Sequence, residues 1–139
     1  IHLKRRNILR TLISSRIAYS TGVYGVRSDD EYAKYKKKVK AISYPAEDLA
    51  KDFRQTRTWE QAGDDMFSCH PMISIDYEDL VSQPDEVFNK VTDFIGIGNK
   101  KPKKDFKKQR TKSMLDVLVN YEELKTTFSG TEWQIFFNE

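Results

Sequence analysis

Residues 1–14 read IHLKRRNILRTLIS, and this stretch decides the fold because it passes from a strand into a helix. Residues 1–4 are typical of the end of a strand. Asn7 is a favourable N-cap residue, so we expect a helix from there to about Tyr19. Apolar and polar side chains fall on opposite sides of that helix: Ile8, Leu9, Leu12 and Ile13 against Asn7, Arg10, Thr11 and Ser14.

Two more helices are expected before the next strand. One is an exposed, Lys-rich helix over residues 31–40, and the other is a long helix over residues 45–66 that opens with a proline. On the long helix, Leu49, Phe53 and Trp59 recur at roughly helical spacing, and we expect them to form its apolar face.

A second strand is expected at residues 72–75, followed directly by the Asp-Tyr-Glu-Asp-Leu segment 76–80. The next helix covers residues 84–95, with apolar residues at i, i+1, i+4, i+7 and i+8, and a glycine ends it. Residues 114–128 are expected to form two helical pieces that break near Asn120. Strands that alternate with helices predict an α/β layer structure with a parallel sheet.

Charge is distributed unevenly, although the 139 residues carry a formal net charge of only +3. Residues 1–28 hold six basic and no acidic side chains. The expected loop at residues 100–110 holds seven basic side chains and one acidic side chain. Two basic blocks on an otherwise acidic chain favour an anionic ligand over general affinity for nucleic acid.

Composition limits the class of protein. Apolar residues make up 38% of the chain, which is enough for a packed core, and no apolar run reaches the roughly 20 residues of a membrane span. The single cysteine, Cys69, excludes an internal disulfide, so we expect a reducing, cytoplasmic location. The chain opens at Ile1 with too few strands for a complete sheet, and we therefore expect a truncated domain.

Arg6 and Ser14 are candidate ligands of a phosphate monoester. Arg6 offers a planar fork of donors at the helix entrance, and Ser14 offers a hydroxyl two turns along the helix. The positive end of the helix dipole adds to the attraction. A solvated polar helix face is the alternative interpretation of the same residues.

The chain resembles the bacterial type of the sulfotransferase family in three segments that follow one another in the right order. Arg6 followed by Ser14 looks like the family's 3′-phosphate motif. Residues 73–80 and the helix after them resemble its strand, Tyr-Glu-Asp-Leu turn and next helix. The Asn-Tyr-Glu-Glu-Leu segment 120–124, with the later Gly-Thr pair at 130–131, looks like its C-terminal element.

This resemblance implies a partial P-loop-like, three-layer α/β fold, with residues 1–139 as the C-terminal part of a single domain. It also implies the donor 3′-phosphoadenosine 5′-phosphosulfate (PAPS), whose sulfuryl group passes to a hydroxyl or amine acceptor and leaves 3′,5′-bisphosphoadenosine (PAP). Arg6 and Ser14 would bind the 3′-phosphate. A late basic segment closes over that phosphate in the wider family, and Lys108 and Arg110 are the candidates here.

The resemblance also indicates what the chain lacks. The N-terminal strands, the Gly-containing loop that grips the 5′-phosphosulfate and the general base would all precede Ile1, so no catalytic residue is assigned. By itself the chain is expected to bind the donor weakly and to transfer nothing. Tyr77 is expected to pack, Glu78 to tie its turn to backbone donors, and His2 and His70 to be structural. No metal-ligand spacing is present.

Other functions and partners stay open at this point. The acceptor could be a small molecule, a carbohydrate or a lipid, and an exposed sheet edge could drive formation of a homo-oligomer. No membrane partner is expected. An RNA- or polyanion-binding module is one alternative, although no nucleic-acid motif supports it. A fragment of a P-loop kinase is another.

Overall fold

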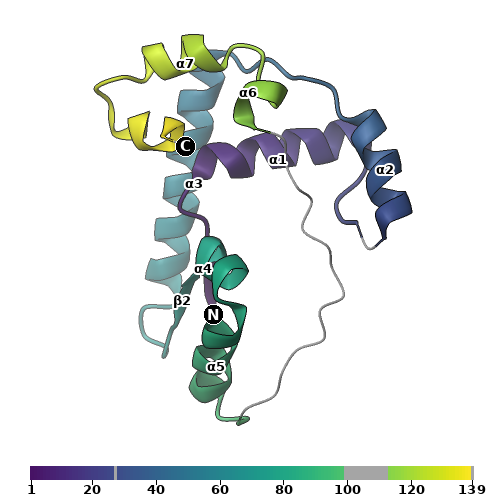
Figure 1. The fold of residues 1–139 in the computed structure, drawn as a ribbon. Helices are drawn as coiled ribbons and strands as arrows, with labels where there is room; N and C mark the ends of the chain where they lie inside the picture. The colour runs from purple at the N-terminus through teal and green to yellow at the C-terminus, as the bar shows by residue number, and fades with distance from the viewer. Residues whose placement is uncertain (27, 99–112, 139) are drawn as a thin grey trace. The chain divides into compact units, whose positions relative to one another are not determined.

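The computed structural model (Figure 1) describes residues 1–26, 28–98 and 113–138. Over these residues the chain consists of helices and one small, two-stranded parallel sheet, which confirms the expected α/β class. None of the described helices is both long and apolar enough to cross a lipid bilayer. The predicted loop at residues 100–110 lies outside the described residues.

The chain divides into two compact units. The sheet unit comprises Ile1–Arg6 and Arg54–Lys103, and the aromatic unit comprises Asn7–Phe53 and Lys104–Glu139. Helix α3 (Ala46–Met66) contributes its first two turns to the aromatic unit and the remainder to the sheet unit. The expectation of a single domain over the whole chain stays a prediction.

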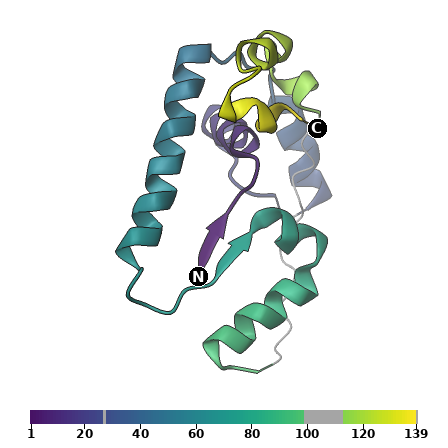
Figure 2. The same cartoon turned by 90° about the vertical axis from the view of Figure 1, so that its left-hand side faces the viewer.

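The sheet unit is organised around strands β1 (His2–Lys4) and β2 (Ser74–Asp76), which lie side by side and point the same way in Figure 2. They pair in parallel, with Leu3 opposite Ile75. The second strand begins two residues later than the sequence predicts, although His2 N already donates to the carbonyl of Ile73 (2.9 Å). Among the described residues of this unit, Ile75 and Val87 are the buried apolar side chains.

Two helices follow β2 without a loop. Helix α4 (Tyr77–Ser82) occupies the position where a turn was expected, and α5 (Pro84–Ile95) begins after a single linking residue. Acidic side chains in the first turn of α4 favour a helix there, because they lie at the positive end of its dipole. Gly96 ends α5 with φ +72°, a left-handed conformation that favours glycine, as predicted.

The aromatic unit begins with α1 (Ile8–Thr21), and the predicted cap is confirmed because Asn7 Oδ1 accepts a hydrogen bond from Arg10 N (3.1 Å). Helix α2 (Asp29–Lys38) starts two residues earlier than expected. Its start is fixed by Ser28, whose hydroxyl accepts from Glu31 N (3.2 Å).

The C-terminal part of the aromatic unit contains α6 (Met114–Val117), α7 (Tyr121–Thr127) and the 3₁₀ helix η1 (Glu132–Phe137). The predicted break near Asn120 is confirmed. Parallel pairing of Ile42 with Leu118 joins this part to the segment ahead of α3.

An aromatic core holds the aromatic unit together. Phe53 is fully buried, and its ring centroid lies 5.1 to 5.7 Å from those of Phe128, Trp133 and Phe136. Ile8, Leu9 and Ile13 of α1 are buried in the same cluster, as their spacing predicts. Burial of large aromatic rings is the main stabilising term in such a core.

Trp59 does not belong to the apolar face on which it was predicted. Its side chain is 68% exposed, whereas Leu49 and Phe53 are fully buried. The physical reason is the spacing, because six helical residues turn the chain by about 240° and carry Trp59 away from the face of Phe53.

Candidate functional site

Arg6, the first predicted phosphate ligand, lies between β1 and α1 and is held by acidic residues of the β2–α4 junction. Its Nε donates to Asp76 Oδ2 (2.9 Å), its Nη2 donates to Asp79 Oδ1, and its backbone N donates to Glu78 Oε2 (3.1 Å). The hydrogen bonds to Asp76 and Asp79 raise the pKa of Arg6. The arrangement follows from the parallel register, which places Lys4 opposite Asp76 and so brings the two strand ends together.

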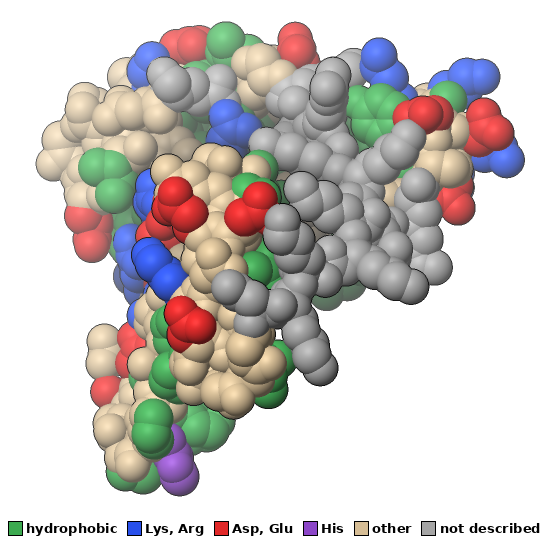
Figure 3. Space-filling model, turned by 60° about the horizontal axis from the view of Figure 1, so that its bottom comes forward, with side chains coloured by type: hydrophobic (Ala, Val, Ile, Leu, Met, Phe, Trp, Pro, Cys, Tyr) green, Lys and Arg blue, Asp and Glu red, His purple; other side chains and the backbone are tan. Residues whose placement is uncertain are grey.

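The neighbouring residues bear out two structural predictions. Glu78 ties the segment after β2 to a backbone donor, namely the N–H of Arg6. Tyr77 packs under the guanidinium of Arg5, whose central carbon lies 4.7 Å from the ring centroid. Arg5 Nε also lies 3.8 Å from Glu78 Oε1. Figure 3 shows basic side chains (blue) bordered by acidic ones (red) on one face of the molecule.

Ser14, the second predicted phosphate ligand, lies in the second turn of α1 and is half-buried. No described residue forms a hydrogen bond with its hydroxyl. Ser14 belongs to the aromatic unit and Arg6 to the sheet unit. Their joint role as a phosphate site stays a prediction. Lys108 and Arg110 lie outside the described residues.

Both histidines line a hollow of about 330 Å³ in the sheet unit, together with Gly63, Phe67 and other apolar residues. His2 Nδ1 lies 2.7 Å from Asp64 Oδ1, and Lys4 Nζ donates to Asp64 Oδ2 (2.5 Å). These bonds lower the pKa of the Asp64 carboxyl, Lys4 contributing more than His2. Asp64 lies on α3, so the cluster ties β1 to that helix, which fits the structural role expected for His2.

Sequence reasoning missed the partners of these basic residues. None of Asp76, Asp79 and Asp64 was predicted to pair with a basic side chain, and Asp64 was expected to be solvated. Asp76, however, follows a predicted strand, and parallel strands end at one edge of a sheet. That edge rule could have found Asp76, but nothing in the sequence indicates the pairing of Lys4 with Asp64. Within the described ranges, no group of three His, Cys, Asp or Glu side chains is arranged to hold a metal ion.

Comparison with known proteins gives one match. The family model described as Stf0 sulphotransferase matches residues 1–123. Neither a curated protein nor a solved structure matches the chain.

Proposed function

Because the chain belongs to the Stf0 sulphotransferase family, we propose that it supplies the 3′-phosphate site for sulfuryl transfer from PAPS to a hydroxyl or amine acceptor. The family match gives sulfuryl transfer as the general reaction. The donor and the roles of Arg6 and Ser14 are the proposal. The observation that carries it is the extent of the match, since residues 1–123 include both Arg6–Ser14 and the strand with its acidic continuation.

The Arg6 guanidinium suits a phosphate because the described residues use only part of its donor capacity. Two of its nitrogens donate to Asp76 and Asp79, whereas an arginine offers about five N–H donors. The side chain is 55% exposed, so a ligand can reach it. The Ser14 hydroxyl, which has no hydrogen-bond partner among the described residues, supplies a further donor.

The acidic neighbours of Arg6 compete with a bound phosphate. Exposed ion pairs of this kind contribute little to stability because solvent screens them, whereas a phosphate dianion forms stronger, bidentate hydrogen bonds with arginine. We therefore infer that Asp76 and Asp79 hold Arg6 in place when no ligand is bound. When the donor binds, some N–H groups of the Arg6 guanidinium exchange these carboxylates for the 3′-phosphate. PAPS itself, when bound, supplies the activated sulfuryl group.

The architecture supports a P-loop-like sheet for this site. Strands β1 and β2 are parallel neighbours, and each is followed by a helix, α1 or α4. In parallel α/β sheets, ligands bind beyond the carboxyl ends of the strands, which is where Arg6 lies.

Calorimetric titration of the chain with PAP and with AMP tests the proposal. PAP is expected to bind at least about tenfold more tightly than AMP, because only PAP carries the 3′-phosphate. Arg6→Ala or Ser14→Ala should reduce the affinity for PAP to that for AMP. Arg57→Ala is the matched control, since Arg57 is also an exposed arginine that pairs with an acidic residue. Equal affinities of the unmodified chain for PAP and AMP would contradict the proposal.

Asp79→Asn separates a ligand role of Arg6 from a purely structural one. Removing the competing charge should raise the affinity for PAP about two- to fivefold. If affinity is unchanged or lower, Arg6 acts only as a tie between β1 and α4. Tight, salt-sensitive RNA binding that survives Arg6→Ala would favour the RNA-binding alternative, and phosphoryl transfer from ATP would favour the kinase alternative.

A further inference from the structure

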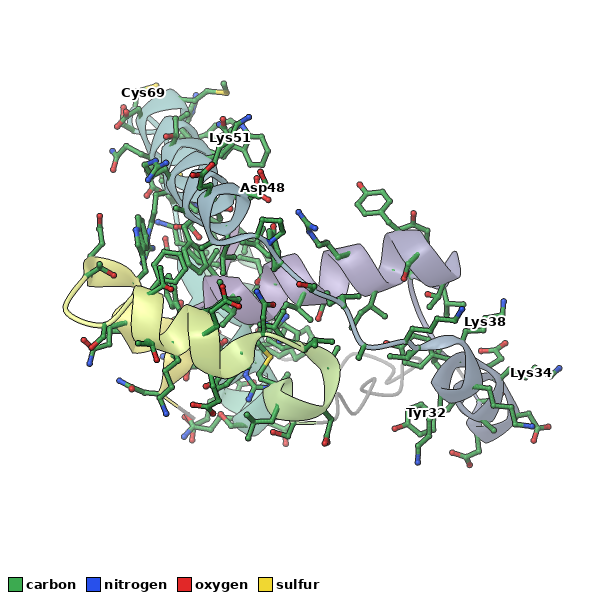
Figure 4. All side chains as sticks on the ribbon, turned by 90° about the horizontal axis from the view of Figure 1, so that it is seen from above. Tyr32, Lys34, Lys38, Asp48, Lys51 and Cys69 are labelled. Carbon is green, nitrogen blue, oxygen red and sulfur yellow. The ribbon has the colours of Figure 1, made fainter. Side chains whose placement is uncertain are left out.

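The hollow that both histidines line lies at the amino ends of the two strands, whereas Arg6 lies beyond the carboxyl end of β1. Its volume, about 330 Å³, is in the range of sites that hold small molecules, about 300–1,000 Å³. Figure 4 labels Cys69, which precedes His70 at the end of α3 that borders the hollow. The lining consists of Ile1, His2, Gly63, Phe67, His70, Pro71 and Met72, all from the sheet unit.

One nitrogen of the His2 ring is fixed by Asp64, and the other is left for a ligand. Asp64 Oδ1 lies 2.7 Å from His2 Nδ1, and Lys4 Nζ donates to the second oxygen of the same carboxyl. The hydrogen bonds from Lys4 and His2 lower the pKa of Asp64, so the carboxyl is ionised at neutral pH and can only accept. Nδ1 therefore carries the proton, and in the neutral imidazole Nε2 is a hydrogen-bond acceptor. No described residue donates to Nε2.

The space beside this nitrogen exists because residue 63 is glycine. Gly63 lies inside α3, where glycine is a less favourable residue than alanine. A Cβ atom at this position would lie 3.5 Å from His2 Cε1 and 3.9 Å from His2 Nε2. Alanine would therefore fit without a clash, but it would occupy space next to the acceptor nitrogen. The glycine keeps that edge of the imidazole open.

The other walls of the hollow are largely apolar, and backbone hydrogen bonds hold them in place. Phe67 is 50% exposed, and its ring centroid lies 6.4 Å from that of His70. His70 N donates to the carbonyl of Phe67 (2.9 Å), which fixes the turn after α3. His2 N donates to the carbonyl of Ile73 (2.9 Å), which joins β1 to the segment containing Met72. The hollow thus combines an accessible aromatic ring with one fixed acceptor.

We propose that this hollow binds a small bicyclic aromatic compound with a single ring N–H group, that is, a free indole. The indole N–H is only a donor, so it matches the fixed acceptor at His2 Nε2. The aromatic body packs against the ring of Phe67 and the thioether of Met72. An anionic ligand is disfavoured, because it would meet the lone pair of Nε2 and the nearby carboxylate of Asp64. This inference does not depend on the proposed function.

Titration of the full chain with indole and with benzofuran, followed by nitrogen NMR of the imidazole at about pH 8, tests the proposal. The two compounds share a bicyclic shape, but benzofuran has an oxygen in place of the N–H group. Indole is expected to bind about fivefold or more tightly, which is the contribution of one hydrogen bond. The resonance of His2 Nε2 should shift on binding. That of Nδ1 should shift less, because its hydrogen bond with Asp64 is unchanged.

Two pairs of variants locate the site. His2→Phe should abolish the preference for indole, whereas His70→Phe, the same change at the other histidine of the hollow, should keep it. Gly63→Ala leaves the contact between His2 and Asp64 intact and should weaken both compounds about threefold or more, since the added methyl group fills space next to Nε2. Ala62→Val adds bulk at an exposed neighbour on the same helix and should leave both affinities unchanged.

Several outcomes overturn the proposal. Equal affinities for indole and benzofuran would remove the donor requirement, and loss of the preference only in His70→Phe would assign the acceptor to that ring. Unchanged affinities in Gly63→Ala would place the ligand elsewhere. If His2→Phe does not fold, the Nε2 shift and Gly63→Ala still decide. Because neither probe carries a phosphate, these results leave the proposal for Arg6 and Ser14 untouched.

Discussion

Asn120 and Tyr44 are joined by a reciprocal pair of hydrogen bonds, although 76 residues separate them. Tyr44 N donates to Asn120 Oδ1 (3.1 Å), and Asn120 Nδ2 donates to the carbonyl of Tyr44 (2.9 Å). The side-chain amide therefore pairs with the backbone as a neighbouring strand would, and continues the bridge between Ile42 and Leu118. The C-terminal helices are thereby fixed to the segment that leads into α3.

Asn120→Ala is expected to lower the free energy of unfolding by about 1–3 kcal/mol, because Tyr44 N–H and C=O both lose their partner. Urea denaturation measures this change. Glu123→Ala on the exposed side of α7 is the control and should stay within about 0.5 kcal/mol of the unmodified chain. A loss in Asn120→Ala no greater than in the control would show that the amide pair contributes nothing.

Phe53→Ala is expected to destabilise the aromatic unit by about 3–5 kcal/mol, since a fully buried ring is removed from contact with three others. Emission of the buried Trp133, recorded in a Trp59→Phe background, reports the loss of packing. Trp59→Ala, at a side chain that is 68% exposed, should leave the denaturation midpoint nearly unchanged. If Phe53→Ala and Trp59→Ala lowered the denaturation midpoint equally, the placement of Phe53 in the core would be contradicted.

The raised pKa of Tyr44 predicts that the free energy of unfolding falls at alkaline pH. Burial, with a smaller contribution from the hydrogen bond that its hydroxyl donates to Asp52, raises the pKa of Tyr44 to about 12 from 10.0. The folded state therefore holds this proton more tightly than the unfolded state. The resulting stability is fully present below pH about 10 and is lost as the pH rises to about 12.

Ultraviolet titration should show a tyrosine that ionises at about pH 12, and Tyr44→Phe should abolish that step. In the same variant, the free energy of unfolding should depend less on pH between about 10 and 12. A step at about pH 12 that persists in Tyr44→Phe would assign it to another ring.

The lowered pKa of Asp64 predicts that the free energy of unfolding falls at acidic pH. Hydrogen bonds from Lys4 and, to a lesser degree, His2 lower the pKa of its carboxyl from 3.8, so its contribution is present above that value and is lost as the pH falls through the folded pKa. Lys4→Met should raise the carboxyl pKa towards 3.8, as measured by carbon-detected NMR. Lys51→Met, at an exposed lysine of α3, should leave it unchanged. An unaltered pKa in Lys4→Met would mean that the ion pair is not formed in solution.

The features that could be predicted from the sequence are those set by residues next to one another in the chain. The cap at Asn7, the helix stop at Gly96 and the break at Asn120 are each set by local backbone chemistry, and all three are confirmed. The turn expected after β2 is instead the short helix α4, because a six-residue element leaves too little periodicity to recognise.

Contacts between residues far apart in the chain could not be predicted from the sequence. Spacing and residue type suggested a phosphate role for Arg6, but not that Asp76 and Asp79 hold its guanidinium across some seventy positions. Likewise, the sequence predicted only an exposed, Lys-rich helix over residues 31–40, and not that Lys34 and Lys38 line a hollow together with Tyr24. Pairing of this kind is fixed by tertiary packing, on which a single sequence carries little information.

The amide of Asn7 has a consequence for how the protein ages. Its Oδ1 caps α1 while its Nδ2 donates to the carbonyl of Phe136 (3.0 Å). Spontaneous deamidation to aspartate would keep the cap, because a carboxylate also accepts from backbone N–H groups. It would replace the donor with a negative oxygen that faces the carbonyl of Phe136. An old preparation should therefore keep its first helix and loosen its C-terminal aromatic turn, a change that mass spectrometry would register as a gain of about one dalton, the difference between an amide and an acid.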